Sequence, residues 1–218
     1  MKRLVVAIDG PAGAGKSTVA RIAAEKLGYT YIDTGAMYRG VAWKALQQKQ
    51  EITDALILDV VRDIDVDLHY EGGATTVTVD GTDVSKAIRT PKVSHLVSQV
   101  AKLGPVREKM VALQRKMAER GSVLMDGRDI ATNVLPHADV KIYLTASIEE
   151  RARRRCKELQ EKGHAVRLSD IRADIAARDK ADMEREISPL VQADDAMRLD
   201  TTGMSINEVV EKILEMCR

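Results

Sequence analysis

The sequence contains few aromatic, cysteine or histidine residues. Phenylalanine is absent and aromatic residues make up 3% of the 218 residues, which argues against a stacking platform for single-stranded nucleic acid. The two cysteines, Cys156 and Cys217, have neither CxxC nor Cys/His ligand spacing, so we expect reduced structural thiols. The four histidines are scattered singly and form no metal-binding pattern.

An excess of charge and a long apolar run are missing as well. The net charge is +1, from 34 basic and 33 acidic residues, so no overall field would attract nucleic acid or an anionic membrane. No segment is long and apolar enough to cross a bilayer, and residues 1–4 lead directly into a predicted strand instead of a signal peptide. We expect a cytoplasmic monomer that binds neither nucleic acid nor membrane.

A glycine-rich motif lies near the start of the chain. It matches G-x-x-x-x-G-K-[ST], follows a predicted buried strand over 4–8 and precedes a predicted helix over 19–27. The alternative is a strand-to-helix turn that binds no ligand. A glycine-rich loop of this pattern, however, typically turns its N–H groups around phosphate oxygens at a helix N-terminus. Its lysine would reach the terminal phosphates of ATP, and its serine would bind Mg2+. The residues expected at ATP are Gly10, Pro11, Ala12, Gly13, Ala14, Gly15, Lys16, Ser17 and Thr18.

The segment Asp33 to Arg39 follows a second predicted strand, over 29–33. It therefore leaves the carboxyl edge of the sheet, where open α/β sheets bind ligands. Arg39 could project toward this edge, where it would suit a second phosphate group. Taken alone, Asp33 or Thr34 is explained equally well as the N-cap of the helix that follows.

From residue 64 the hydrophobic pattern changes to strict alternation. Residues 64–70 and 75–79 alternate on either side of a Glu-Gly-Gly turn, which predicts an antiparallel hairpin. A helix is predicted from Pro91 to residue 100 and another over 106–119. We interpret 64–101 as a subdomain inserted into a single α/β domain over residues 1–218.

A strand predicted over 122–126 ends in an acid at the same edge of the sheet. Asp126 is placed like a Walker B aspartate, which holds Mg2+ directly or through water. Arg128 and Asp129 follow it. An Arg–Asp pair in a loop is usually a salt bridge, but after such a strand contact with substrate is about equally favoured.

Two arginine-rich helices are predicted after a strand over 140–144. A capping box at 147–150 opens the first, which carries Arg151, Arg154 and Arg155 on one face. That face is either solvated or part of a lid over the triphosphate. We assign Arg154 to ATP and about residues 151–168 to the lid.

The second helix, predicted over 169–187, places Arg178, Asp182 and Arg185 on one stripe because their offsets are four and seven. Asp182 would either form ion pairs only or hold both guanidinium groups rigidly for phosphate binding. A strand over 196–199 and a helix opened by a second capping box at 205–208 follow.

Together these motifs resemble the bacterial cytidylate kinase family. The resemblance rests on 8–17, 33–39, 98–101, 105–107, 126–129 and 178–185, and it covers essentially the whole chain. The insertion is similar to that of the bacterial enzymes and unlike the shorter eukaryotic pyrimidine kinases. The resemblance implies an α/β fold of the P-loop NTPase type: a three-layer sandwich with a central parallel sheet, an inserted monophosphate-binding subdomain with antiparallel strands, and a helical lid.

The resemblance also implies a transferase of pyrimidine nucleotide metabolism that moves the γ-phosphoryl group of ATP to CMP or dCMP. Positioning, Mg2+ and arginines would stabilise in-line transfer without a general base, because the acceptor is already an anion. Catalytic roles are implied for Lys16, Arg128, Arg178, Asp182 and Arg185, and metal binding for Ser17 and Asp126. Acceptor binding is implied for Asp33, Thr34, Arg39, Ser98, Arg107, Arg128, Asp129, Arg178 and Arg185.

Three of these residues suit recognition of the base. Asp129 and Ser98 could accept the cytosine amine proton, and Arg107 could donate to the ring acceptors. Uracil would place a carbonyl against the carboxylate and be rejected. Two alternatives remain: a P-loop kinase of another monophosphate or small metabolite, and a nucleotide-dependent switch, against which stands the missing N-K-x-D sequence.

Overall fold

The structure is a computed structural model that describes residues 3–119, 121–161 and 163–218. Met1 and Lys2, at the start of the predicted domain, and Lys162, in the expected lid, lie outside the described residues. In chain order the elements are β1 (Val5–Asp9), α1 (Lys16–Leu27), β2 (Thr30–Asp33), α2 (Thr34–Gln47), α3 (Asp54–Asp63), β3 (Val66–Glu71), β4 (Ala74–Val79), β5 (Thr82–Asp83), the 3-10 turn η1 (Ala87–Arg89), α4 (Pro91–Val100), α5 (Gly104–Ala118), β6 (Val123–Asp126), the π-helical turn η2 (Ile130–Val134), β7 (Val140–Thr145), α6 (Ile148–Glu161), α7 (Leu168–Met183), β8 (Met197–Asp200) and α8 (Ile206–Met216).

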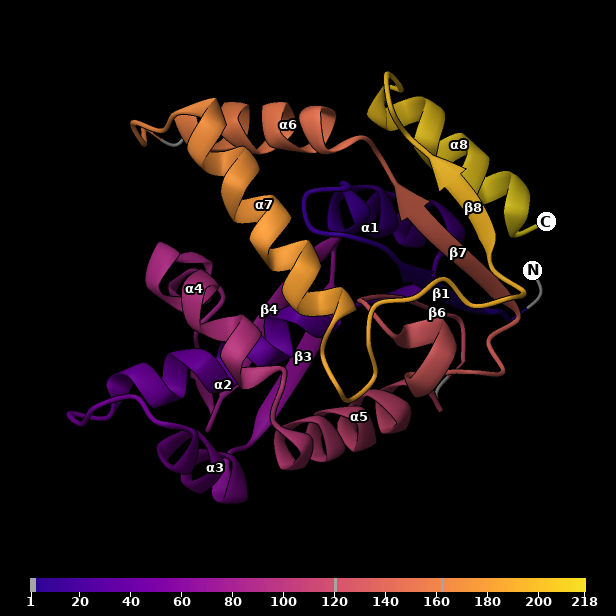
Figure 1. Cartoon of the computed structure of the whole chain (residues 1–218). Coiled ribbons are helices and arrows are strands. Elements are labelled where there is room, and N and C mark those ends of the chain that lie inside the picture. The colour runs from indigo at the N-terminus through magenta and orange to yellow at the C-terminus, as the bar shows by residue number, and fades with distance from the viewer. Residues whose placement is uncertain (1–2, 120, 162) are drawn as a thin grey trace.

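A five-stranded parallel sheet in the order β2-β6-β1-β7-β8 forms the centre of the molecule (Figure 1). Strands β1 and β6 are continuous apolar runs up to a terminal aspartate, as expected for strands covered on both faces. Val6 and Ile8 pack with residues of α1 and α8 on one face, whereas Ala7 and Met125 pack with residues of α5 and η2 on the other. The predicted three-layer α/β fold is therefore confirmed.

The hairpin predicted after residue 64 is part of a separate antiparallel sheet in the order β3-β4-β5. Together with α2, α3 and α4 it surrounds a second core, in which Leu68 pairs with Val77 across the hairpin. Helix α2 approaches this sheet so closely that a Cβ added to Gly40 would lie 3.0 Å from Val79. The sequence-based interpretation missed α3, although its N-cap is ordinary: the Thr53 hydroxyl accepts the Leu56 N–H.

Helices α6 and α7 pack on each other through Ala152, Cys156, Ile171 and Ile175, and in Figure 1 α7 runs down from α6 to the left of strands β7, β1 and β6. The predicted extent of α7 was too long, because the helix ends at Met183. Ser188 has a positive φ of 51° and precedes a proline, which excludes a helical continuation there. Arg185 therefore lies in a loop beyond the helix.

The two cysteines are free thiols, as predicted, with Cys156 buried in the α6–α7 core. Within the described ranges, no helix combines the length and apolarity needed to cross a membrane.

Candidate active site

The glycine-rich loop joins the carboxyl end of β1 to the N-terminus of α1. Gly10 has a φ of 148°, and a Cβ at this position would lie 1.9 Å from the Leu144 carbonyl oxygen of the neighbouring strand, so only glycine fits. Gly15 is left-handed, with a φ of 89°, and is the N-cap of α1. The first turn of α1 therefore presents backbone N–H groups at this edge, where anions bind favourably.

Lys16 lies inside this loop and is 5% exposed. Its Nζ donates hydrogen bonds to the carbonyl oxygens of Gly10 at 2.7 Å and Pro11 at 2.8 Å. Burial, together with the nearby Arg128 guanidinium, lowers the Lys16 pKa well below its usual value. A buried ammonium beside other cations is a site that favours a polyanion.

Asp126 lies at the end of β6, where two hydroxyl groups donate to its carboxylate. Ser17 Oγ lies 3.0 Å from Oδ2, and Tyr31 Oη lies 2.7 Å from Oδ1. Burial and the neighbouring Asp33 raise the Asp126 pKa to about 6. Although no group of three or more potential His, Cys or acidic metal ligands occurs among the described residues, a serine hydroxyl and a carboxylate fit Mg2+, which takes few protein ligands beside substrate phosphates.

The N-terminus of α2 brings further charge to this edge. Asp33 Oδ1 accepts the Ala36 N–H, so the N-cap interpretation of Asp33 is confirmed. Its other oxygen is 2.8 Å from Arg89 of η1, a half-exposed cation that the sequence analysis missed. Burial alone would raise the Asp33 pKa, but Arg39 and Arg89 outweigh it and lower the pKa. Thr34 Oγ1 donates to the Asp126 carbonyl oxygen at 2.8 Å.

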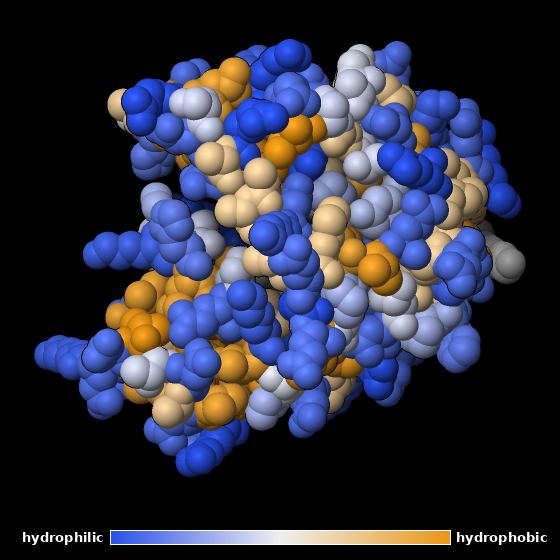
Figure 2. All heavy atoms as spheres, in the orientation of Figure 1, coloured by the Kyte–Doolittle hydropathy of each residue, from blue (hydrophilic) through white to orange (hydrophobic). Residues whose placement is uncertain are grey.

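Next to these groups is an open cleft. Figure 2 shows a notch on this face, between the lobe of α6 and α7 and the lobe of α4. The cleft brings together segments that are far apart in the sequence, including all three residues assigned to the base. Its lining residues are Thr34, Gly35, Tyr38, Val97, Ser98, Ala101, Arg107, Gly127, Arg128, Asp129, Arg178, Asp182 and Arg185.

Asp129 is the ionic centre of the inner part of the cleft and is 5% exposed. Its carboxylate forms ion pairs with both Arg107 and Arg185, the latter at 3.1 Å, and accepts a hydrogen bond from Asn133 at 3.0 Å. The Arg107 guanidinium also lies over the Tyr38 ring, 5.7 Å from its centroid. Acceptor, donor and aromatic groups are thus fixed side by side.

The predicted stripe on α7 is arranged differently from the expectation. Asp182 forms an ion pair at 2.8 Å with Arg128, whereas Arg185 pairs with Asp129, because the helix ends before Arg185. The interpretation in which Asp182 holds both Arg178 and Arg185 by ion pairs is therefore wrong. Within the described part of the chain, Arg178 Nε is buried without a hydrogen-bond partner. Burial, Arg128 and Arg39 lower the Arg178 pKa to about 9.

The arginines of α6 do not act as one face. Arg154 donates to the Thr201 carbonyl oxygen at 2.7 Å, and its NH1 lies 4.0 Å from where a Cβ on Gly15 would stand. Arg155 pairs with Glu158 on the surface. Arg151 is buried against the glycine-rich loop.

Asp9 is a second residue that the sequence analysis missed, although its place at the end of β1 could have indicated it. Its carboxylate is 2% exposed and accepts the N–H groups of Ile130 at 2.9 Å and Ala131 at 2.8 Å. Burial raises its pKa to about 6 against these hydrogen bonds. Asp9 thereby joins the strand before the glycine-rich loop to the turn after Asp129.

The chain is similar to known proteins over its whole length. A family model described as cytidylate kinase matches residues 6–218. The chain is 52% identical over 216 residues to a cytidylate kinase of Bacillus cereus (strain ATCC 10987 / NRS 248), which covers 99% of this chain and 96% of that protein. It is 53% identical over 214 residues to a cytidylate kinase of Bacillus thuringiensis (strain Al Hakam), covering 98% and 95%.

Two solved structures have a similar fold at low sequence identity. An uncharacterized protein from Eubacterium ventriosum ATCC 27560 gives a TM-score of 0.54 at 12% identity and covers 98% of this chain and 97% of that chain. A gluconokinase from Sinorhizobium meliloti 1021 gives a TM-score of 0.50 at 16% identity and covers 98% and 90%. These likenesses concern the fold alone.

Proposed function

Because this chain belongs to the cytidylate kinase family, it is an ATP-dependent transferase that phosphorylates CMP or dCMP with a divalent metal, and we propose how its residues divide this reaction. The division rests on one observation: two groups of charged residues with different arrangements lie next to each other at one edge of the sheet. Lys16, Arg128 and Arg178 form a cationic group at the glycine-rich loop. Asp129 with its two arginines forms an ion-paired, hydrogen-bonding group in the cleft.

The donor half is the glycine-rich loop with the start of α1. Backbone N–H groups from Gly13 to Thr18 bind the phosphates of ATP, and Lys16 neutralises the terminal phosphates. Ser17 and Asp126 hold Mg2+, which when bound would neutralise charge on the phosphate oxygens. Arg154 contributes from α6, beside Gly15.

The acceptor half is the cleft. Arg39, Arg128 and Arg178 bind the monophosphate, and the unpaired Arg178 Nε donates to one of its oxygens. Asp129 and Ser98 accept from the cytosine amine and Arg107 donates to the ring, whereas Asp182 orients Arg128. Arg185 fixes the Asp129 carboxylate by an ion pair, and Thr34 fixes the backbone at Asp126 by a hydrogen bond.

We propose further that the chain is one kinase domain in which residues 64–101 form the monophosphate-binding insertion and about 151–168 form the lid. One chain supplies the donor, acceptor and lid groups, which supports action as a monomer. Nucleotide substrates favour a cytoplasmic location, and a net charge of +1 supports the absence of a nucleic-acid partner.

A pair of variants tests the division between the two halves. Lys16→Met should abolish transfer while CMP still binds in an equilibrium titration, because its ammonium belongs to the donor half. Arg107→Met should weaken CMP binding while a non-hydrolysable ATP analogue still binds with unchanged affinity. Loss of CMP binding in the first variant, or of analogue binding in the second, would contradict the assignment.

A further inference from the structure

Helices α6 and α7 both hold the glycine-rich loop at one residue, Ala12. Asp179 Oδ1 of α7 accepts the Ala12 N–H at 3.0 Å, and Arg151 NH1 of α6 donates to the Ala12 carbonyl oxygen at 2.8 Å. Arg151 and Asp179 are bonded to each other, and Arg151 Nε also donates to the Ala146 carbonyl at 2.9 Å. Both charged residues are less than 10% exposed.

The Pro11–Ala12 peptide connects this ion pair to Lys16. Its N–H is the group that Asp179 accepts, and its carbonyl oxygen, that of Pro11, accepts a hydrogen bond from Lys16 Nζ at 2.8 Å. A trans peptide is planar, with N–H and C=O pointing in opposite directions, and the described peptide bonds are trans. Rotation of this peptide would therefore break the hydrogen bonds on both of its sides.

We propose that Arg151 and Asp179 are a positioning pair for Lys16, acting through the Pro11–Ala12 peptide, and that they couple the glycine-rich loop to the acceptor cleft. The proposal rests on the donor role given above to Lys16. Neither side chain needs to touch a nucleotide, since both are occupied by Ala12 and by each other.

The coupling follows from neighbouring positions on α7. Arg178, which lines the acceptor cleft, directly precedes Asp179, so a shift of α7 on binding the acceptor moves the peptide that orients Lys16. Gly13 adds a second contact, because a Cβ there would lie 3.3 Å from Arg151 Cβ and 3.4 Å from Ile175 Cδ1. The two helices therefore contact the loop at the consecutive residues Ala12 and Gly13.

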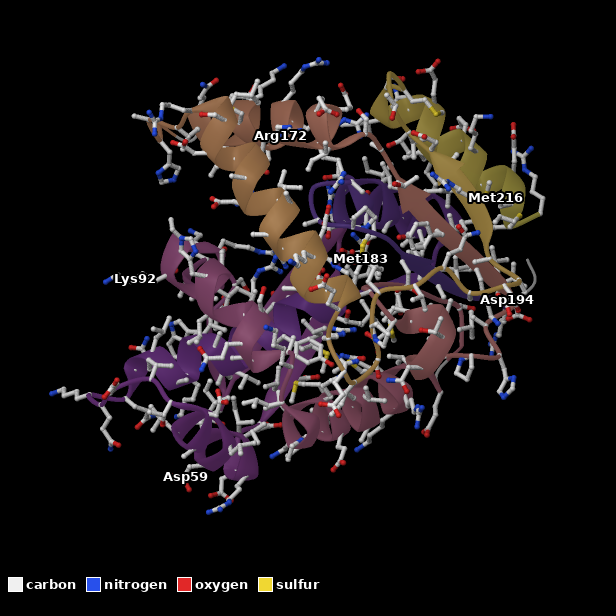
Figure 3. All side chains as sticks on the ribbon, viewed as in Figure 1. Asp59, Lys92, Arg172, Met183, Asp194 and Met216 are labelled. Atoms are coloured by element: carbon white, nitrogen blue, oxygen red, sulfur yellow. The ribbon has the colours of Figure 1, made fainter. Side chains whose placement is uncertain are left out.

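A second ion pair between the same helices provides a matched control. Glu149 and Arg172 are 3.3 Å apart, with side-chain exposures of 53% and 57%, and link α6 to α7 at the surface. Figure 3 places Arg172 near the α6 end of α7, far along the helix from Met183. This pair connects the same helices without contacting the loop, so it separates helix pairing from loop positioning.

The test compares Asp179→Asn with the paired variant Glu149→Gln, Arg172→Gln. Steady-state kinetics give kcat and both KM values, and equilibrium titrations give CMP affinity with and without a non-hydrolysable ATP analogue. We expect Asp179→Asn to lower kcat at least tenfold, to bind CMP alone within twofold of wild type, and to lose any effect of the analogue on CMP affinity. The control should keep all three wild-type values.

Unchanged kcat and unchanged analogue effect in Asp179→Asn, even with a lower melting temperature, would overturn the proposal and leave a purely structural ion pair. Should that variant fail to fold, Arg151→Met with Asp179→Leu carries the same expectation, because no charge is left buried alone. Lys16→Met separates this result from the donor assignment: full activity in that variant refutes the role of Lys16 itself, whatever Asp179→Asn does.

Discussion

Arg178→Met should make the protein more stable and less active. The guanidinium is partly buried and its Nε has no partner within the described chain. After burial, the largest influences on its pKa are two other arginines. A cation held in such a place is unfavourable for folding and favourable for an anionic ligand. Methionine keeps much of the length and removes the charge.

The size of the effect follows from the pKa. Lowering the Arg178 pKa from 12.5 to about 9 corresponds to a ceiling of about 5 kcal/mol against the charged form in the folded state. Because the folded-state pKa of this base is depressed, its unfavourable contribution is fully present below about pH 9, including neutral pH. The ceiling already includes the attraction to Asp182, and partial exposure reduces the expected gain in unfolding free energy to about 1–2 kcal/mol.

Urea denaturation at pH 7 measures this gain, and coupled kinetics measure the loss of CMP phosphorylation in the same preparation. Added CMP should raise the melting temperature of the wild type more than that of the variant. The reason is that only the wild type has the Arg178 cation, which the bound phosphate would stabilise. Arg172→Met is the control on the same helix: its side chain is 57% exposed, and it should change neither stability nor activity appreciably. A variant that is less stable than wild type, or that retains CMP binding, would refute the reasoning.

Three further predictions concern the carboxylates and the metal site. Asp129→Asn should reduce the preference for CMP over UMP by roughly 10- to 100-fold while changing kcat less; Asp129→Ala would in addition leave Arg107 and Arg185 without a counter-ion, so a lower melting temperature is expected for it alone. Ser17→Ala should raise the Mg2+ concentration needed for half-maximal transfer by roughly tenfold or more. Chelation of the metal by EDTA should stop transfer in the wild type and in Ser17→Ala. Asp9 should lower the unfolding free energy by about 3 kcal/mol as pH rises from about 4 to 6, because its folded-state pKa is raised from 3.8 to about 6. In Asp9→Asn this part of the fall should be missing while the part due to Asp126, whose pKa is also raised to about 6, remains; an unchanged fall would exclude the assignment.

Much of the fold could be predicted because local signals and global fold agree. Strands β1 and β6 are apolar runs, and α4 begins at Pro91 behind a Thr90 cap, as predicted. The second capping box also forms, with Ser205 and Glu208 bonded reciprocally. The predicted end of α7 was too late because the chain after Met183 folds back, with the Leu190 N–H donating to the Asp182 carbonyl oxygen, a contact that no local sequence signal indicates.

The sequence predicted which residues lie in the site better than it predicted which of them form ion pairs with each other. Sheet topology brings Lys16, Asp33 and Asp126 to one edge, which motifs at strand ends indicate in advance. Helical spacing suggested that Asp182 holds Arg185. Long side chains, however, can form ion pairs with residues of other elements, and Asp182 forms its ion pair with Arg128. Arg89 and Asp179 belong to no motif, and only the folded chain places them beside Asp33 and Ala12.

The most direct test of the account is ATP consumption by the purified chain with CMP, dCMP, UMP, AMP or dTMP as acceptor, and with none. CMP and dCMP should support rapid turnover, UMP should be used poorly because its carbonyl meets the Asp129 carboxylate, and ATP should be nearly stable without an acceptor. Equal turnover with AMP or dTMP, or steady hydrolysis of ATP alone, would contradict an acceptor site built around Asp129.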